Sequence, residues 1–509
     1  MMGEKSRRIK KKKTAKKIIF SDIWRFFLTN TSIHGCKRIS DKKISLLEKA
    51  LWITFSLVSI VLTFIILQTL WNDYVNNPIF IARDPVDIPV TEISFPGVAI
   101  CNINKISKKR ALRFAETLHS QHSFIREKFH TVSDLAEALR LLANLYDYSD
   151  IRVDIAQTLQ DILEKYDNLT DDVNLVKRLI HLAPACNEIL EKCKWGGRDY
   201  ECRDLLFTRE TFDGFCCVFN YVKRRKGAAK LIHETADTVR NPYNGAGQGI
   251  DKGLQLTLKN NLEDYFSTTL ETNGYIVSIF NPRDYADKSS GSLTEIVVNA
   301  GTEVFVSIQV SVVNSQQSIR MFPWKMRKCI FNDEIHTEYG DFRNSDCLAV
   351  CKMKAMKNLC QCVPFFDPIG DYSFCRLTDL PCLSNFYRKW TSYYPTGESS
   401  PSLNFEREDS INCEHCLPAC NDQIYHVSVD TSPIKINSNN KTYVNVYFQH
   451  PFGAAYNRRL TQEWYQLLSN FGGFISLIMG LSFISFAEIL LLVLKLIVYY
   501  YNRIINDTI

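Results

Sequence analysis

The chain has 509 residues, 23% of them charged, and a formal net charge of +6 at pH 7. The positive excess lies near the N-terminus, and the nearly balanced remainder, with no nucleic-acid-binding motif, argues against a nucleic-acid partner. The sequence contains no phosphate-binding glycine loop, no Gly-x-Ser-x-Gly, no His-Glu-x-x-His and no acid–base pair of carboxylates. We therefore predict that the protein is not an enzyme and uses no cofactor.

The first 49 residues combine a basic tail with a short polar segment. Lysines and arginines recur from Lys5 to Lys17. Such a run is either a solvated, disordered tail or, beside a membrane span, an orientation signal that also attracts anionic membrane lipid. His34 and Gly35 follow in a stretch too polar to span a bilayer, where by themselves they indicate only a solvated turn.

Residues 50–71 (ALWITFSLVSIVLTFIILQTLW) carry no charge and are long enough to cross the ~30 Å hydrocarbon core of a bilayer as a helix. A small-residue cleavage site is missing, so we interpret the segment as a retained transmembrane helix over 50–72 rather than a signal peptide.

Short strands and helices are predicted after this span. Pro96 and Gly97 set the start of a strand at Val98–Ile100, and residues 105–182 then show helical periodicity. The latter include a capping box from Thr131 to Asp134 and amphipathic helices at 154–166 and 171–182. From Cys186 onward, β-branched and aromatic runs predict strands at 216–220, 253–258, 275–280, 303–310 and 442–449.

Cysteines and sequons indicate which regions face the outside of the cell. Of 17 cysteines, Cys36 precedes the first span, and the other sixteen lie between the two apolar segments. An even number in an oxidising compartment predicts disulfides, and we expect no zinc site because matching histidine spacing is absent. Ten of these cysteines fall between Cys329 and Cys420, a segment that we expect to depend on disulfides because it is too short to bury much core. Asn168 and Asn440 are predicted glycan acceptors.

A second apolar stretch lies near the C-terminus, and no charge interrupts it from Trp464 to Ala487. Small and polar residues recur along it every three or four positions, which places them on one helical face: Ser469, Gly472, Gly473, Ser476 and Gly480. The phase then shifts by two residues to Ser482, Ser485 and Glu488, which predicts a helix broken at Gly480–Leu481–Ser482. A packing face and a pore lining both fit the stripe, and Glu488 favours contact with water.

Two spans place both termini on the same side of the membrane, and the basic tail makes that side cytosolic. We therefore predict an extracellular region over 73–463, a second transmembrane helix over 464–494 and a cytosolic C-terminus over 495–509 of a multi-pass plasma-membrane protein.

Ordered motifs along the chain give it a family resemblance. They are His34-Gly35, Phe95-Pro-Gly-Val-Ala-Ile-Cys-Asn, Cys216-Cys217-Val-Phe-Asn, the Cys329–Cys420 cluster, and Ser469-Asn-Phe-Gly-Gly with Gly480-Leu-Ser and Glu488. In this order they resemble the degenerin/epithelial sodium channel family, and the doubled cysteine resembles insect pickpocket-type subunits. The resemblance implies a membrane α+β fold: two transmembrane helices flanking a disulfide-rich extracellular domain with a palm sheet, helical finger (105–185), cysteine-rich thumb (329–420), knuckle and β-ball. It also implies a homo- or heterotrimer of related subunits.

The same resemblance implies a disulfide pattern. Its pairs are Cys329–Cys420, Cys347–Cys416, Cys351–Cys413, Cys360–Cys382, Cys362–Cys375, Cys193–Cys202 and Cys101–Cys216. Cys186 and Cys217 are then left, and we predict that they pair.

Roles for the pore residues also follow from the resemblance. Gly480, Leu481 and Ser482 would form the selectivity filter, with Leu481 in place of the small middle residue usual in the family. Ser469, Gly472, Gly473 and Ser476 would line the pore and the amiloride region, Glu488 would lie at the inner mouth, and Ser469 with His34 and Gly35 would control gating. The implied function is a sodium-favouring, amiloride-sensitive cation channel subunit gated by an extracellular ligand or by mechanical force, with sodium as the permeant ion. Two alternatives are a non-conducting accessory or sensory receptor subunit that needs a heteromeric partner, and an ATP-gated channel, which the cysteine layout disfavours.

Overall fold

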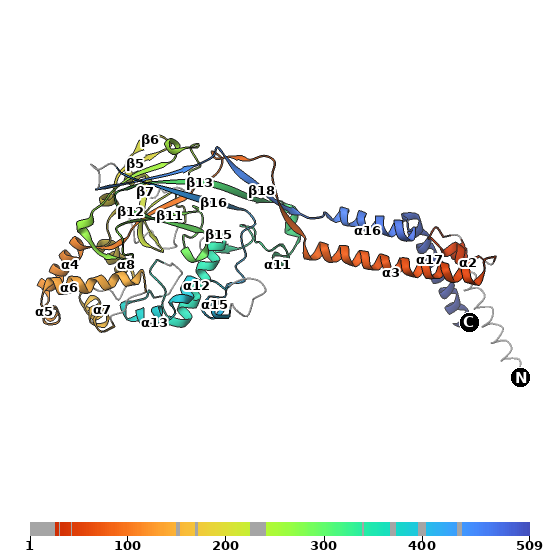
Figure 1. Ribbon diagram of the computed structural model, residues 1–509. Coiled ribbons are helices and arrows are strands. Elements are labelled where there is room, and N and C mark those ends of the chain that lie inside the picture. The colour runs from red at the N-terminus through yellow and green to blue at the C-terminus, as the bar shows by residue number, and fades with distance from the viewer. Residues whose placement is uncertain are drawn as a thin grey trace. The chain divides into compact units, whose positions relative to one another are not determined.

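The fold is described from a computed structural model over residues 26–29, 31–41, 43–148, 153–167, 172–223, 241–337, 340–366, 373–394, 404–434 and 440–508 (Figure 1). The chain divides into two units. The helical unit comprises Met1–Phe80, Met321–Arg327 and Arg459–Ile509, and the disulfide-rich unit comprises Ile81–Arg320 and Lys328–Arg458. The predictions for the basic tail and for Asn168 fall outside the described residues.

Helices make up most of the helical unit. They are α2 (Cys36–Ser40), α3 (Leu46–Asn76), α11 (Trp324–Arg327), α16 (Trp464–Met479) and α17 (Phe483–Thr508). α3 begins at a cap in which the Ser45 hydroxyl accepts a hydrogen bond from the Glu48 amide, and it extends the predicted 50–71 helix at both ends. It is long and apolar enough to cross a membrane, and α16 and α17 meet the same criterion only when taken together as a bent pair.

A short segment from the middle of the chain also belongs to the helical unit, which the sequence did not predict. Residues 321–327 group with the helices, and the rings of Phe322 and Tyr74 meet edge to face with centroids 5.5 Å apart. This contact joins the end of α3 to a part of the chain almost 250 residues later in sequence.

Two large sheets form the framework of the disulfide-rich unit. One has the order β1-β18-β13-β17-β9-β5-β6, with β16 also paired to β13 and β2 to β18, and the other has the order β12-β11-β3-β8-β7. β13 pairs in parallel with β17 and β18, and antiparallel with β16. The strands of the first sheet are β1 (Ile79–Arg83), β2 (Ile88–Pro89), β5 (Leu190–Trp195), β6 (Arg198–Tyr200), β9 (Leu254–Lys259), β13 (Thr302–Ser315), β16 (Asp422–Pro433), β17 (Lys441–Phe448) and β18 (Phe452–Leu460). Those of the second are β3 (Gly97–Asn102), β7 (Leu206–Thr211), β8 (Gly214–Phe219), β11 (Gly274–Phe280) and β12 (Leu293–Asn299).

A hydrophobic core fills the space between these sheets. Val306 and Val444 of the first sheet and Ile100 and Val277 of the second are fully buried in one cluster. Burying each such side chain contributes about 1.5–3 kcal/mol. The alternation of buried and exposed positions along β9 and β13 shows why period-2 patterns predicted strands there correctly.

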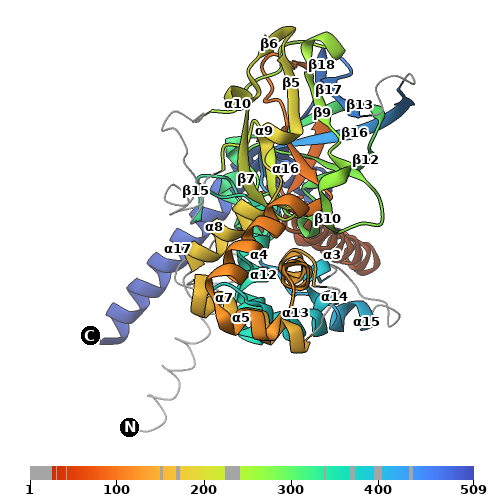
Figure 2. The same cartoon turned by 90° about the vertical axis from the view of Figure 1, so that its left-hand side faces the viewer.

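Residues 105–189 of the disulfide-rich unit are mainly helical (Figure 2). The helices of residues 105–189 are α4 (Lys108–Gln121), α5 (Ser123–Lys128), α6 (Val132–Leu139), η1 (Arg140–Leu145), α7 (Val153–Asp167), α8 (Asp172–Leu182) and α9 (Cys186–Ile189). The capping box at Thr131 and Asp134 is present, because each side chain accepts a hydrogen bond from the other residue's amide. The helical periodicity of this region is therefore confirmed.

The cysteine-rich segment differs from the sequence expectation, because it does bury a core. Its helices are α12 (Asn344–Cys360), η7 (Leu377–Asp379), α13 (Leu380–Asn385), α14 (Tyr387–Thr391) and α15 (Asn404–Glu408). Met353, Phe365 and Leu383 are buried in one cluster with Leu139 and Leu159 of the preceding helices. The expectation that this segment buries little core is therefore wrong, because it shares an apolar core with helices far away in sequence, although its five disulfides are present as expected.

Smaller elements complete the disulfide-rich unit. β4 (Asn104–Ser107) pairs with β10 (Tyr265–Thr268), and β14 (His336–Thr337) pairs with β15 (Gly340–Asp341). The short helices are α10 (Cys202–Leu205), η3 (Ile250–Lys252), η4 (Leu262–Asp264), η5 (Lys288–Ser290) and η6 (Gln317–Met321).

Eight disulfides use sixteen of the cysteines, and Cys36 is free. They are the seven pairs that the resemblance implied and the remaining pair, Cys186–Cys217. The doubled cysteine serves both faces of β8, because neighbouring strand residues point in opposite directions. Cys216 bonds Cys101 in one buried cluster, whereas Cys217 lies in the core between the sheets and bonds Cys186. His415 approaches Cys347 and Cys416, but those two sulfurs already bond each other.

A buried ionic cluster lies where the start of α12 meets the start of β16. Arg343, the N-cap residue of α12, lies 3.9 Å from Asp284 and 3.6 Å from Asp422. Lys223 and Asp346 form a second ion pair nearby. Burial, together with the neighbouring Asp422 carboxylate, raises the pKa of Asp284 to about 7.

Candidate functional site

The candidate site is the break between α16 and α17 in the helical unit. α16 ends at Gly480, whose φ of 69° is left-handed and whose amide donates to the Ser476 carbonyl over 2.9 Å. α17 begins three residues later, and the two helices meet at 77°. A glycine adopts a left-handed conformation without steric cost, which is why the helix ends there. The predicted break at Gly480–Leu481–Ser482 is confirmed.

Two serines start the second helix. The Ser482 hydroxyl accepts from the Ser485 amide at 3.3 Å, and the Ser485 hydroxyl accepts from the Ser482 amide at 3.0 Å. This reciprocal arrangement caps α17 in the manner of a capping box. Ser482 therefore has a structural role beside the filter role predicted for it, and Ser485 is fully buried.

His34 packs directly against this break and Gly35 follows it. The helix that comes next, α2, is drawn near the α16–α17 junction in Figure 1. The His34 amide donates to the carbonyl of Met479, the last residue of α16, over 3.0 Å. A Cβ atom on Gly480 would lie 2.4 Å from Cδ2 of His34, and a Cβ atom on Gly35 would lie 2.8 Å from the Ser56 hydroxyl of α3. Both glycines are therefore required by close packing and by their positive φ angles.

Ser32 extends the contact to α17. Its amide donates to Oε2 of Glu488 over 3.1 Å, and its hydroxyl shares a hydrogen bond with that of Ser485. Glu488 is half-buried. The segment from Ser32 to Gly35, which we call the N-terminal loop, thus contacts the end of α16, the break and the first turns of α17.

The small-residue stripe of α16 does not serve packing within the chain. α16 packs along α3, yet the stripe residues Ser469, Gly472, Gly473 and Ser476 are exposed. A Cβ atom added to Gly472 or Gly473 would meet no atom within 4 Å. Glycines retained for close approach between helices would have near neighbours. The face is therefore available to water or to another subunit.

Sequence reasoning identified most residues of this site but not its internal contacts. Ser32 and Met479 were missed, and Ser485 was noted only for its polarity. A serine three residues after Ser482 is a capping signal that could have been recognised. Nothing local connects Ser32 with Glu488, because 456 residues separate them.

The family profile described as amiloride-sensitive sodium channel matches residues 27–492. The chain belongs to this family. Its members are sodium channel subunits of the plasma membrane rather than enzymes, and they assemble into oligomers of related subunits.

Individual relatives match over nearly their whole lengths. The chain is 26% identical to pickpocket protein 19 of Drosophila melanogaster over 492 residues, covering 92% of this chain and 89% of the relative. It is 24% identical to sodium channel protein Nach of Drosophila ananassae, covering 92% and 85%. It is 21% identical to the mouse bile acid-sensitive ion channel, covering 91% and 86%. The matches therefore include both the helical and the disulfide-rich units.

Proposed function

We propose that the protein is a pore-forming subunit of a trimeric, sodium-favouring and amiloride-sensitive cation channel, with α3 and the bent α16–α17 pair as its two spans. The observation that carries the proposal is the broken helix at Gly480–Ser482 with the N-terminal loop packed into it. Irregular backbone at membrane depth is stable only where protein buries it or where it lines a wet path. In this arrangement both termini are cytosolic and the disulfide-rich unit is extracellular.

The backbone at the break suggests which groups meet the ion. The Met479 carbonyl accepts from His34, and the Ser482 carbonyl accepts from the Phe486 amide at 3.1 Å. We assign ion contact to the carbonyls of Gly480 and Leu481, which lie between these two. Three copies would form a ring of oxygens that replaces water around a small cation. The Leu481 side chain, half-buried in the chain, would then point away from the lumen.

Charge and gating are assigned to the residues around this ring. Glu488 on α17 would concentrate cations at the inner mouth, and its hydrogen bond to Ser32 would link that charge to the N-terminal loop. Ser469 and Ser476, exposed on α16, would line the outer pore and the amiloride region. An extracellular ligand or mechanical force acting on the disulfide-rich unit would open the pore.

Voltage clamp of cells that express the subunit alone tests the proposal. Ser469→Val adds bulk to the exposed stripe and is expected to raise the resting sodium current, which amiloride blocks. Ser469→Ala, which removes the hydroxyl without adding bulk, is the matched control and leaves the current at rest small. Replacing external sodium with a large organic cation abolishes the inward current.

Two outcomes would contradict parts of this proposal. A surface-expressed Ser469→Val subunit that carries no current alone but does so with a related subunit would favour the obligate-partner alternative. A surface-expressed variant that carries no current in either setting would refute a pore-forming role.

A further inference from the structure

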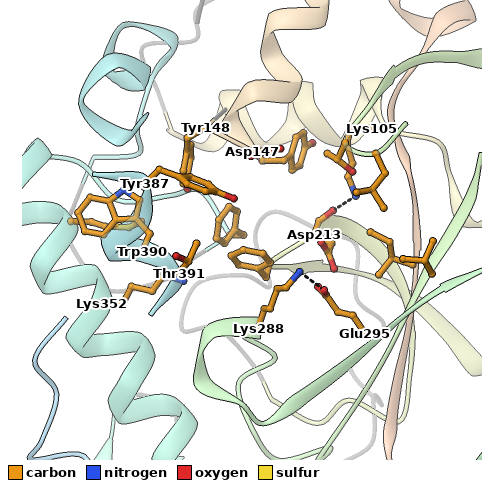
Figure 3. A pocket seen from close by; sticks show the side chains of 18 residues that line it. Lys105, Asp147, Tyr148, Asp213, Lys288, Glu295, Lys352, Tyr387, Trp390 and Thr391 are labelled. Carbon is orange, nitrogen blue, oxygen red and sulfur yellow. Dashed lines mark hydrogen bonds and ion pairs between the residues drawn. The ribbon is translucent and has the colours of Figure 1, made fainter. Parts of the chain in front are cut away.

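The disulfide-rich unit contains a cavity of about 270 Å³ that has no part in the ion path proposed above (Figure 3). Its walls come from β4, the end of η1, the turn between β7 and β8, the β10–β11 segment, the η5–β12 segment, Phe366 and the helices α12 and α14. Its size is near the lower end of the range for small-molecule sites, about 300–1,000 Å³. A ligand that fills it would therefore be small.

One wall of the cavity is aromatic. Figure 3 shows Tyr148, Tyr387 and Trp390 together on one side, and further rings from Tyr146 and Phe212 line the same cavity. Several rings are held in place before any ligand binds. The Trp390 indole donates to the Leu383 carbonyl over 2.9 Å, and Tyr146 is buried. A preformed aromatic wall loses little conformational entropy when it binds a ligand.

The opposite wall is ionic. Figure 3 shows Lys105, Asp213, Lys288 and Glu295 there, with Asp147 close to Lys105. Lys105 donates to the Asp213 carbonyl over 2.7 Å, and Lys288 pairs with Glu295. This wall has three carboxylates against two ammonium groups, so its formal charge is −1.

The remaining lysine of the lining does not change this balance. The ammonium group of Lys352 lies 3.2 Å from a carboxylate oxygen of Asp287, which is not part of the lining. That pair is internally neutral. The cavity as a whole therefore keeps the negative charge of its ionic wall.

Part of this wall carries an energetic cost of burial, because Lys105 is buried and Glu295 half-buried, whereas Lys288 is exposed. Burial lowers the pKa of Lys105, and burial together with the neighbouring Asp213 carboxylate raises the pKa of Glu295. The lining also includes Thr269, whose hydroxyl is buried and makes no hydrogen bond within the described residues. Perturbed ionisable groups and an unsatisfied hydroxyl around a cavity are typical of binding sites.

We propose that this cavity binds a small aromatic amine, with its ammonium group against Asp213 and Glu295 and its ring among Tyr148, Tyr387 and Trp390. A cation neutralises the excess carboxylate charge and removes the repulsion between Asp213 and Glu295. Aromatic faces attract both the ring and the adjacent cation. Tyr387 is 43% exposed, so its ring stands at the entrance to the site, whereas Tyr148 is buried and lines both this cavity and a neighbouring one.

Binding to the purified full-length protein tests this proposal independently of ion conduction. Isothermal titration calorimetry with 2-phenylethylamine is expected to show one site per chain. 2-Phenylethanol and 3-phenylpropanoate, which have a similar shape but no positive charge, are expected to bind at least tenfold more weakly. Ethylamine, which has no ring, should also bind at least tenfold more weakly.

Three variants locate the site. Asp213→Asn keeps the backbone carbonyl that holds Lys105 and is expected to weaken amine binding at least tenfold. Tyr387→Leu removes a partly exposed ring at the entrance and should weaken it about fivefold. Asp199→Asn, on exposed β6 outside the lining, is the matched control and should bind as the unmodified protein does.

The proposal is overturned if the folded protein does not bind the amine at millimolar concentration. It is also overturned if 3-phenylpropanoate binds as tightly as the amine, or if both Asp213→Asn and Tyr387→Leu fold normally and keep full affinity. If Asp213→Asn does not fold, Tyr387→Leu and the ligand series decide the question.

Discussion

Replacing Gly480 by alanine tests the packing of the N-terminal loop against the broken helix. Gly480 has a φ of 69°, and an alanine in this conformation costs about 1–2 kcal/mol. Its Cβ atom would also lie 2.4 Å from Cδ2 and 2.6 Å from Nε2 of His34. Such overpacking costs about 1–3 kcal/mol. Together these effects disfavour the observed arrangement by about 2–5 kcal/mol, and the lower bound corresponds to about a thirtyfold shift toward a released loop.

Cys36 provides a native probe of that release. The other sixteen cysteines are in disulfides, so a maleimide modifies this thiol alone. Cys36 is half-buried beside Gly35, and burial raises the pKa of its thiol. Release of the loop would both expose the thiol and increase the reactive thiolate. In permeabilised membranes, Gly480→Ala should speed the labelling of Cys36 at least tenfold. This is less than the thirtyfold shift expected in the equilibrium between the packed and the released loop.

Two further variants test whether the clash with His34 is what speeds the labelling of Cys36 in Gly480→Ala. Gly291 of the disulfide-rich unit has a similar φ of 71°, and a Cβ atom there would meet nothing within 4 Å, so Gly291→Ala is the control for a positive-φ glycine replaced away from the loop and should leave the labelling rate unchanged. In a His34→Ala background the clash is gone, so Gly480→Ala should have a smaller effect than in the unmodified chain. Equal labelling rates for Gly480→Ala and the unmodified protein would refute the loop–break contact.

Three other predictions concern the disulfide-rich unit. The raised pKa of Asp284 means that the folded state keeps a proton that the unfolded state releases between about pH 4 and 7, so this group lowers stability as pH rises through that window. Thermal unfolding from about pH 5 to 8 should therefore show a flatter pH dependence for Asp284→Asn than for the unmodified protein, whereas exposed Asp333→Asn should not flatten it. Removing Cys186–Cys217, whose cysteines are 31 residues apart, should destabilise the fold by about 1 kcal/mol more than removing Cys193–Cys202, which are 9 apart, and denaturant unfolding of the two double-alanine variants measures this. Asn440→Gln should remove one glycan detected as a glycosidase-sensitive gel shift, Asn506→Gln should not, and a shift caused only by Asn506→Gln would reverse the proposed topology.

Local sequence patterns were sufficient to predict many of the helices, strands and helix caps of this protein. The apolar run of α3, the capping box at Thr131 and the alternation along β13 are short-range signals, and the structure confirms each. The break in the last helix was also predictable, because Gly480 permits a left-handed residue and the polar stripe changes phase there. The cysteine pairing followed from the family resemblance, since sixteen cysteines alone leave the connectivity open.

Other features of the structure depend on packing between residues far apart in the sequence. The sequence did not predict β16, whose twelve residues are mostly exposed and gain their order from pairing along β13. The hydrogen bond from Ser32 to Glu488 and the cavity lined by Lys105, Asp213 and Tyr387 join residues far apart in the chain. The sequence by itself determined the helices, strands and helix caps that carry a local signal, because such signals depend on neighbouring residues. Only the tertiary structure determined which distant polar groups share a buried site, because that depends on how the sheets, helices and disulfides bring them together.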